Sequence, residues 1–522
     1  MSSITTVAVW LRNDLRLIDN RVIQEAMQRV RDGEFFLPVF TVDQLGHSPL
    51  TGIPRVGDKR AQFQVESIMD LKKSLKRIGS DLLVAVGRPE EVFKKLRQEL
   101  GVRLVVAASE CCTEEKQDEK RVGEVVDIHL VKDANFMYPF SLYTKLFGDR
   151  LQHLSNVFTP ARKVIESASV DIPQPLPAPK RLPPVPSREV MEGCSYRIDF
   201  EPTMDTMLGK DSSSLSSSSK DSKDSKNSKD SNQNPVLNFV GGESSAMARL
   251  EYYIFGKERL VSKYFTTRNG MLGGDYSTKF SPWLANGSLS PRSVHHAIKK
   301  FERDTGVANK STYWVTFELL WRDFFHLIAL KQGSALFRER GFLPKAPTWQ
   351  GGQESFERWK KGETGWPLVD ANMKELATGF MSNRGRQIVA SFLVHDLSVD
   401  WRFGAEFFEH HLIDYDPASN WGNWLYVAGL SGGRVNRFNI LKQSADYDKD
   451  GRYVRYWLPE LRKLPAHAVH QPWRLSSNQL ERFGADQYPA PIRTQKFVKT
   501  RIGQRRQRGQ RGQRGQRGQR GQ

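Results

Sequence analysis

The feature that most constrains the fold is a change in hydrophobic periodicity along the chain. In the first third, short apolar, β-rich runs alternate with segments whose apolar residues recur at helical spacing. This order is typical of α/β proteins with a doubly wound parallel sheet. The expected strands are residues 7–10, 35–42, 81–86, 103–107 and 125–130, and the expected helices include 61–78 and 90–100. The turn after the first strand lacks Gly-x-Gly-x-x-Gly, which disfavours a Rossmann-type dinucleotide site there.

The chain is too long for one compact core, and its composition divides it further. After Met247 the pattern changes to long helical segments rich in Trp, Phe and Arg, which continue to about Leu464 and predict an all-α domain. Prolines crowd residues 173–186, and the Ser/Lys/Asp tract 212–234 is too polar to fold. We therefore expect an α/β domain at 1–135, a linker with a disordered tract at 136–245, an all-α domain at 246–482 and a disordered tail at 483–522.

The formal charge of +19 is concentrated in part at the C-terminus. Eight arginines and no acid lie between Arg501 and Gln522, which leaves +11 for the rest of the chain. An excess of this sign fits nucleic acid, although a solvated basic surface without a partner has the same composition. From Arg508 the chain repeats Arg-Gly-Gln and resembles RGG-type RNA-binding tails. Weak, non-specific affinity is the alternative to RNA binding.

The three cysteines, Cys111, Cys112 and Cys194, have no zinc-ligand spacing and are too few for a disulfide framework. They indicate a reducing, intracellular compartment. The N-terminal sequence does not have the basic region and apolar stretch of a signal peptide, and no run of about eighteen apolar residues could span a membrane. We expect a monomer in the cytoplasm, the nucleus or an organelle.

The densest group of polar residues with chemical potential begins at Tyr264. Hydroxyls and a cation cluster just before Pro282, a residue suited to a first helical turn, and are supplied by Ser277, Thr278, Lys279 and Ser281. Free backbone donors, hydroxyls and a cation suit a pyrophosphate. A plain helix cap is the alternative.

Three further runs combine charged or amide groups with aromatic residues. Glu318 and Trp321 share a helical face, where an acceptor beside a flat ring suits an extruded base; alternatively, Glu318 and Arg322 pair on the surface. The run Asn383-Arg-Gly-Arg-Gln387 places amides and guanidiniums close together, and the alternative is that it only starts a helix. Residues 414–424 carry two carboxylates but no His, so no metal is expected there.

In this order, the motifs resemble the photolyase/cryptochrome superfamily from Val7 to about Leu464. The stretch from Thr267-Arg-Asn-Gly to Tyr276-Ser-Thr-Lys-Phe-Ser-Pro-Trp-Leu-Ala is similar to the cryptochrome DASH branch in particular. The resemblance implies an N-terminal α/β domain joined by a long linker to a helical domain that holds FAD. The implied FAD-binding residues are Tyr264, Ser277, Thr278, Lys279 and Ser281 at the phosphates and ribityl chain, and Asn383, Arg386, Asp414, Asp416 and Asn420 around the isoalloxazine.

Within that set, Arg386 would pair with Asp414 beside the ring, and Asn420 would face N5. The high tryptophan count also gains a use, because Trp424, Trp401 and Trp349 match the family's chain of three tryptophans from flavin to surface. Such a chain passes an electron hole outward. Each of these tryptophans considered alone could equally be a core residue.

The resemblance also implies a substrate. Glu318, Trp321 and Asn383 match residues that hold a cyclobutane pyrimidine dimer in the repair enzymes, with Arg322 at the same wall. The implied reaction is light-driven electron transfer from reduced FAD to a dimer flipped out of the DNA, splitting of the ring and return of the electron. Glu318 would hydrogen-bond the dimer radical anion and would need its proton.

Two positions depart from many dimer photolyases. Tyr426 stands where they carry a second pocket Trp, and Gln387 stands where they carry Met. Both changes are expected to make the pocket more polar and to weaken stacking on the dimer. Since flipping costs a few kcal/mol in a duplex, we expect single-stranded DNA to be preferred, with duplex activity weaker.

Glu110 matches the carboxylate with which DASH members bind a folate antenna, 5,10-methenyltetrahydrofolate, between the domains. The alternative is an ordinary acid at the end of a strand. Two other functions compete with repair: a blue-light photoreceptor that signals without repairing DNA, and an RNA-associated protein that acts through its Arg-Gly-Gln tail. A six-four photoproduct enzyme is disfavoured, because the run 383–387 lacks the histidine that such enzymes use.

Overall fold

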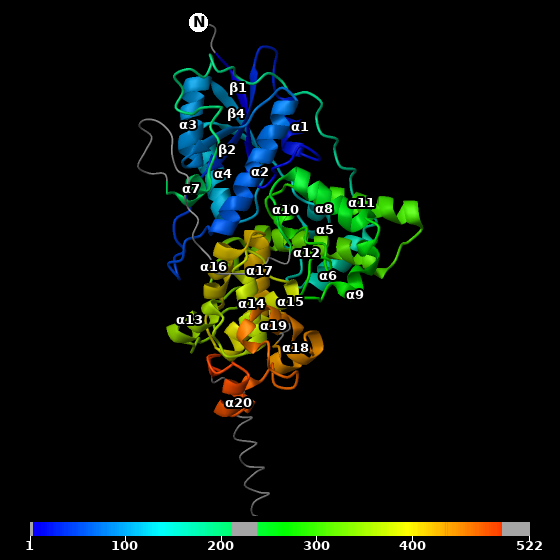
Figure 1. Ribbon diagram of the computed structural model, residues 1–522. Coiled ribbons are helices and arrows are strands. Elements are labelled where there is room, and N and C mark those ends of the chain that lie inside the picture. The colour runs from blue at the N-terminus through cyan, green and yellow to red at the C-terminus, as the bar shows by residue number, and fades with distance from the viewer. Residues whose placement is uncertain (1–3, 211–236, 434, 436, 493–522) are drawn as a thin grey trace, which may run out of the picture.

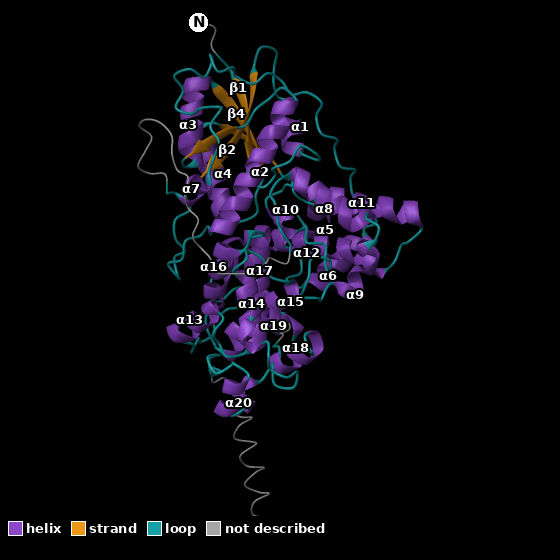
Figure 2. Cartoon of the chain, in the orientation of Figure 1, coloured by secondary structure: helices purple, strands orange, loops and turns teal. Residues whose placement is uncertain are grey.

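The computed structural model describes residues 4–210, 237–433, 435 and 437–492. The Ser/Lys/Asp tract and residues 493–522 of the tail, for which we expected disorder, lie outside these residues. The first part of that expected tail, residues 483–492, is ordered instead: Ala485 and Tyr488 are buried in the helical core, and the Tyr488 hydroxyl donates to Asp370 at 2.5 Å. An α/β half and a helical half lie one above the other, as Figure 1 shows. In Figure 2 the strands of the described chain are confined to the α/β half.

The N-terminal half is built on a five-stranded parallel sheet, which confirms the predicted fold class. The strand order is β3-β2-β1-β4-β5, so the chain winds outward in both directions from β1. Every residue of β1 is buried, as expected for a central strand covered on both faces. The strands are β1 (Thr6–Leu11), β2 (Phe35–Val42), β3 (Leu83–Val86), β4 (Val102–Ala108) and β5 (Asp127–Val131).

Two helices cover each face of the sheet. On one face, α1 (Arg21–Met27) and α2 (Asp58–Arg77) pack against alternate β1 residues such as Val7. On the other, α3 (Pro89–Leu100) and α4 (Thr113–Val125) pack against the intervening β1 residues such as Ala8. Pro89 starts α3, and Gly101 ends it at a φ of 59°, where a Cβ would lie 1.9 Å from the backbone oxygen of Ile4. Only glycine fits there.

The C-terminal half is helical, as the periodicity predicted. Its core gathers the large apolar residues of these helices around the long helix α12. The helices are α8 (Glu243–Phe255), α9 (Tyr264–Thr267), α10 (Ser281–Ala285), α11 (Pro291–Thr305), α12 (Lys310–Gln332), α13 (Gln353–Lys361), α14 (Pro367–Leu376), α15 (Asn383–Ser391), α16 (Trp401–His411), α17 (Pro417–Ala428), α18 (Ile440–Tyr447), α19 (Arg452–Trp457) and α20 (Ser477–Arg482). Short 3-10 turns lie at Leu260–Lys263, Gly333–Phe337, Pro459–Leu461 and Pro472–Arg474, and a π-helix at Phe392–Asp396.

The segment between the halves is packed rather than loose in its described part. Helices α5 (Phe140–Phe147) and α6 (Phe158–Ser167) join the helical core, and α7 (Met204–Leu208) packs against α2. The proline-rich stretch 173–186 forms no helix or strand. It follows the sheet, since the amide of Phe36 donates to the carbonyl of Pro184 at 2.8 Å.

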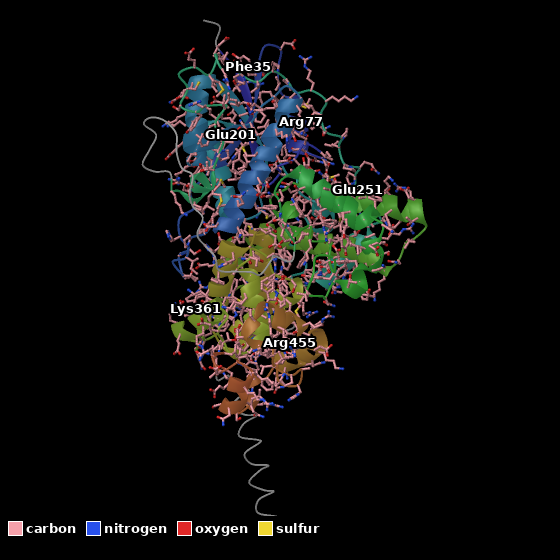
Figure 3. All side chains as sticks on the ribbon, in the orientation of Figure 1. Phe35, Arg77, Glu201, Glu251, Lys361 and Arg455 are labelled. Carbon is pink, nitrogen blue, oxygen red and sulfur yellow. The ribbon has the colours of Figure 1, made fainter. Side chains whose placement is uncertain are left out.

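Buried polar contacts join the two halves. Arg292 at the start of α11 pairs with Asp19 at 2.8 Å, and both side chains are 0% exposed. Glu243 accepts from the amides of Leu17 and Ile18 at 2.8 and 2.9 Å. Figure 3 shows side chains filling the space between the α/β half, marked by Arg77, and the helical half, marked by Glu251 on α8. In the described chain, no helix is both long and apolar enough to cross a bilayer.

Candidate active site

Lys279 is a buried cation in need of an anion. The residue is 3% exposed, and its Nζ lies 3.5 Å from the centre of the Tyr276 ring and 4.5 Å from that of Phe380. Among the described residues it has no hydrogen-bond partner, and burial lowers its pKa to about 7. A phosphate beside Nζ would remove the cost of burying this unpaired charge. The unpartnered Nζ of Lys279 therefore fits a pyrophosphate.

The loop before Lys279 is held from behind by Arg249 on α8. Its guanidinium donates to the carbonyls of Gly274 at 2.8 Å and Thr278 at 3.1 Å. Arg249 thereby fixes the backbone while the half-buried hydroxyls of Ser277 and Thr278 form no hydrogen bond within the described chain. Both predicted hydroxyls stay available to a ligand. Tyr264 lies buried at the start of α9, within the core of the helical half.

A second polar cluster joins α10, α15 and the segment between α16 and α17. Arg386 on α15 pairs with Asp414 at 2.8 Å, which is the expected pair, and Ser281 donates to the same carboxylate oxygen at 2.6 Å. The other oxygen of Asp414, Oδ1, is buried and has no partner among the described residues. An unused buried acceptor next to a guanidinium fits a ring that offers an N–H group, as an isoalloxazine does. Ser281 thus supports Asp414 rather than standing apart from it.

Asn420 and Asp416, on α17 and at its cap, are placed differently. Asn420 donates to the carbonyl of Ala405 at 3.0 Å, which orients its amide against α16. Asp416 caps α17 by accepting from the Ser419 amide at 3.1 Å and pairs with His326 at 3.0 Å. Burial alone would raise the pKa of Asp416, but His326 holds it well below its usual range. The structure therefore gives the Asp416 carboxylate partners within the protein.

Of the three predicted tryptophans, two are buried and one is half-buried. Trp424 on α17 is buried against α16, where a Cβ on Gly404 would lie 2.1 Å from its ring. Trp401 begins the same helix one turn earlier and is fully buried. Trp349 is half-buried, and the next residue, Gln350, bonds to the carbonyl of Ser398 just before α16. Trp349 is the most exposed of the three, at the position expected to lie nearest the surface, while Trp424 and Trp401 are both buried.

Two further tryptophans lie beside this series. The Trp421 ring centre is 5.6 Å from that of Trp401, and Trp359 is 6.2 Å from Trp424. Neither had been predicted, because tertiary packing brings them there from α17 and α13 and no sequence motif marks them.

Glu318 has a partner that its spacing did not predict. Arg268, after α9, donates to its carboxylate at 2.7 Å, and Trp314 donates to the same oxygen at 3.2 Å. The side chain keeps 32% of its surface exposed. Burial raises the pKa of the Glu318 carboxyl, and the charge of Arg268 opposes the rise. Arg322, which we expected at the same wall, bonds instead to the carbonyl of Asn135 at 2.6 Å.

Trp321 forms a flat aromatic surface beside Glu318. Phe158 from α6 stacks on it with ring centres 3.8 Å apart and planes inclined by 16°. Asn383 is exposed at the start of α15, where Ser382 caps the helix. The neighbouring Arg384 donates to Asn269 at 3.0 Å. Sequence motifs could not reveal Phe158, which comes from the segment that we expected to be a linker.

The polar groups of Tyr426 and Gln387 form hydrogen bonds within the protein. The Tyr426 hydroxyl donates to the carbonyl of Asn156 at 2.7 Å and accepts from the amide of Phe158 at 3.2 Å. The amide oxygen of Gln387 accepts from Arg384 at 2.9 Å. Tyr426 therefore holds the backbone that carries Phe158 instead of offering its hydroxyl to a ligand.

Glu110 follows β4 at the boundary between the halves. Asn13 donates to it at 3.4 Å, and burial raises the pKa of its carboxyl while Arg12 opposes this. The charge of His326, from the helical half, also acts on it.

A separate cavity of about 580 Å³ lies at the carboxyl ends of β2 and β3 and is lined by residues that include Arg88 and Asp118. In the described residues no group of His, Cys, Asp or Glu could hold a metal ion.

Comparisons with known proteins agree with both halves. A family model described as DNA photolyase matches residues 7–180, and one described as the FAD binding domain of DNA photolyase matches residues 314–508. A cryptochrome DASH from Gloeobacter violaceus is 43% identical and covers 94% of this chain and 93% of its own length. One from Ostreococcus tauri, described as chloroplastic/mitochondrial, is 40% identical, with 96% and 92% covered. The solved structure of a Synechocystis cryptochrome superposes with a TM-score of 0.82 at 39% identity, with 94% and 97% covered.

Proposed function

This chain belongs to the cryptochrome DASH branch of the photolyase/cryptochrome family, and we propose that it repairs cyclobutane pyrimidine dimers under blue light, with single-stranded DNA as its preferred substrate. The observation that carries the proposal is the placement of Glu318 on one face of α12 beside the aromatic surface of Trp321. A carboxyl group and a flat ring are what an extruded pyrimidine pair requires.

The helical half is a FAD-binding domain. Lys279, with the hydroxyls of Ser277 and Thr278, would hold the pyrophosphate, and Asp414 with Arg386 would face the polar edge of the isoalloxazine. Reduced FAD, when bound, supplies the light-excited electron that opens the dimer. Arg386 places positive charge beside the ring, which favours an anionic reduced state.

Glu318 acts on the substrate. In its protonated form the carboxyl donates a hydrogen bond to a dimer carbonyl and stabilises the charge that this oxygen gains. The raised pKa keeps the proton at higher pH than an ordinary glutamate would. Arg268 pairs with the same group at 2.7 Å and adds positive charge beside it. Trp321 offers its ring for stacking.

A second electron transfer would lead to the flavin instead of away from it. Its donors would be Trp424, Trp401 and Trp349. Each indole can give up one electron, and the half-buried Trp349 would connect the two buried tryptophans to the surface. Light absorbed in the site would thus be used to keep the protein in its active, reduced form. A photoreceptor that signals without repair would use the same three residues.

Repair assays test the proposal. The purified holoprotein is illuminated with single-stranded and duplex oligonucleotides that contain one thymine dimer, and intact thymines are counted. We expect repair to be faster on the single strand, to fall strongly in Glu318→Ala and to be unchanged in Glu354→Gln, an exposed control on α13. If the protein binds flavin but repairs neither substrate, the proposed repair activity is refuted and the photoreceptor function is favoured.

We propose Glu110 as the folate contact in an antenna site between the halves. The support is its partly buried carboxyl at the domain boundary, beside Asn13. The holoprotein should carry a near-ultraviolet absorption band from 5,10-methenyltetrahydrofolate after reconstitution, and Glu110→Gln should weaken this binding. Binding that is unaffected by the substitution would favour the cavity at the carboxyl ends of β2 and β3 as the antenna site.

A further inference from the structure

An aromatic strip continues along α12 from Trp321 towards the start of the helix. Its members are Phe317, Trp314 and, from α9, Phe265. The Trp314 ring lies 4.4 Å from that of Phe317, inclined by 28°, and 4.7 Å from that of Phe265. Phe158 connects the strip to Trp321, because it lies 5.2 Å from Phe317 and 3.8 Å from Trp321. The strip is therefore continuous with the proposed lesion pocket.

Positive groups lie over each ring of the strip. The Lys310 ammonium is 3.7 Å from the centre of Phe265, and the guanidinium carbons of Arg268 and Arg162 are 5.1 Å from Trp314 and 5.5 Å from Phe317. Arg268 and Arg162 also pair with Glu318 and Glu166. Lys310 is exposed and forms no ion pair with any described residue.

Ordinary core packing does not account for this surface. Packing would bury the rings, yet Phe265, Trp314 and Phe317 all stay partly exposed, and the adjacent Tyr313 is 39% exposed. Partly exposed rings with cations beside them are the combination that binds single-stranded nucleic acid, through base stacking and phosphate contacts. α6 and α9 lie along α12 here (Figure 1).

We propose that the strip binds the undamaged nucleotides on one side of the dimer in a single DNA strand. This inference rests on the proposed function of Glu318 and Trp321. From Trp321 to Lys310 the helix rises about 17 Å, which corresponds to about five nucleotides at the stacked spacing of 3.4 Å. Unpaired bases can stack on aromatic side chains, whereas the paired bases of a duplex cannot, so the strip favours a single strand through stacking.

The test uses oligothymidylates with one dimer, extended by five nucleotides on the 5′ side only or on the 3′ side only. Their binding to the holoprotein is measured by fluorescence anisotropy in the dark. One extension should increase the affinity and the other should not. Trp314→Leu should reduce the affinity for the favoured oligonucleotide about 5- to 150-fold, while Trp314→Phe keeps a ring and most of the gain.

Charge is tested separately at Lys310. Lys310→Gln should reduce the slope of log affinity against log salt concentration by about 0.7, the value for one phosphate on a single strand. Lys94→Gln, at an exposed position on α3, is the matched control and should leave the slope unchanged. Equal gains from both extensions, or a one-sided gain that survives Trp314→Leu, would overturn the inference. If the native holoprotein did not prefer DNA with a dimer over undamaged DNA, the proposed function itself would be refuted.

Discussion

Replacing Lys279 by arginine should remove most of the pH dependence of FAD binding, which we expect to be steep above neutrality in the native chain. Lys279 is buried and has no carboxylate or carbonyl partner within the described part of the chain, and burial lowers its pKa to about 7. A bound pyrophosphate would hold the ammonium charged, so binding above pH 7 must take up a proton. The affinity for FAD is then highest below pH 7 and falls as the pH rises.

The magnitude follows from the titration. Half of Lys279 is charged at its pKa and about one eleventh at pH 8, so the affinity should fall about fivefold, or about 1 kcal/mol, between pH 7 and pH 8, and about tenfold for each pH unit above that. The fully buried Glu375 acts in the same direction. Burial raises its pKa to about 7, and its negative charge at higher pH repels phosphate. The charges of Arg249 and Arg386 also lower the pKa of Lys279.

The assay is a titration of the FAD-free protein with FAD between pH 6 and pH 9, followed by flavin fluorescence. Lys279→Arg should bind with a flatter profile, because arginine keeps its proton. Lys279→Met should bind weakly at every pH, and Lys257→Met, at an exposed position after α8, should match the native chain. A native affinity that is constant across this range would refute the reasoning. An unchanged slope in Lys279→Arg would assign the titration to Glu375.

Four further predictions concern other parts of the molecule. Repair should decline as the pH rises through the raised pKa of Glu318 and should become independent of pH in that range in Glu318→Gln, as measured by initial rates. Asp19→Asn should lower the free energy of unfolding by about 3–5 kcal/mol, because it leaves a buried arginine unpaired; Asp304→Asn, which breaks an exposed pair, should cost less than about 1 kcal/mol in the same urea titration. Trp401→Phe should abolish photoreduction of the bound flavin in an absorbance assay, whereas undiminished photoreduction would show that electrons follow another route. Removing the residues after Lys499 should weaken RNA binding without changing dimer repair, and unchanged RNA binding would exclude the tail as the RNA site.

Local patterns predicted the α/β half well. The strands and helices were confirmed because each apolar run is short, regular and bounded by turns, as at Phe35–Val42. The switch to helix after Met247 was equally clear. The Arg386–Asp414 pair was expected from the family resemblance and is present. These features depend on spacing or on long motifs, both of which a sequence displays directly.

Contacts between distant segments could not be predicted in this way. Helical spacing suggested a pair between Glu318 and Arg322, but the partner of Glu318 is Arg268, fifty residues earlier. Tyr426 was interpreted as a polar pocket residue, yet packing brings its hydroxyl to the backbone at Asn156. No local pattern encodes such pairings, because they arise only when the helices pack.

The stacking of Phe158 on Trp321 limits how this protein can be divided. Phe158 precedes the polar tract by more than fifty residues in the chain, yet it builds one wall around the tryptophan that would meet the lesion. A polypeptide that starts at residue 246 would keep all the proposed flavin contacts but lack this wall and the packing of α5 and α6. Recombining halves from two relatives would therefore preserve the pocket only if the crossover lay before α5, so that the donor of the helical bundle also supplies the chain that leads into it.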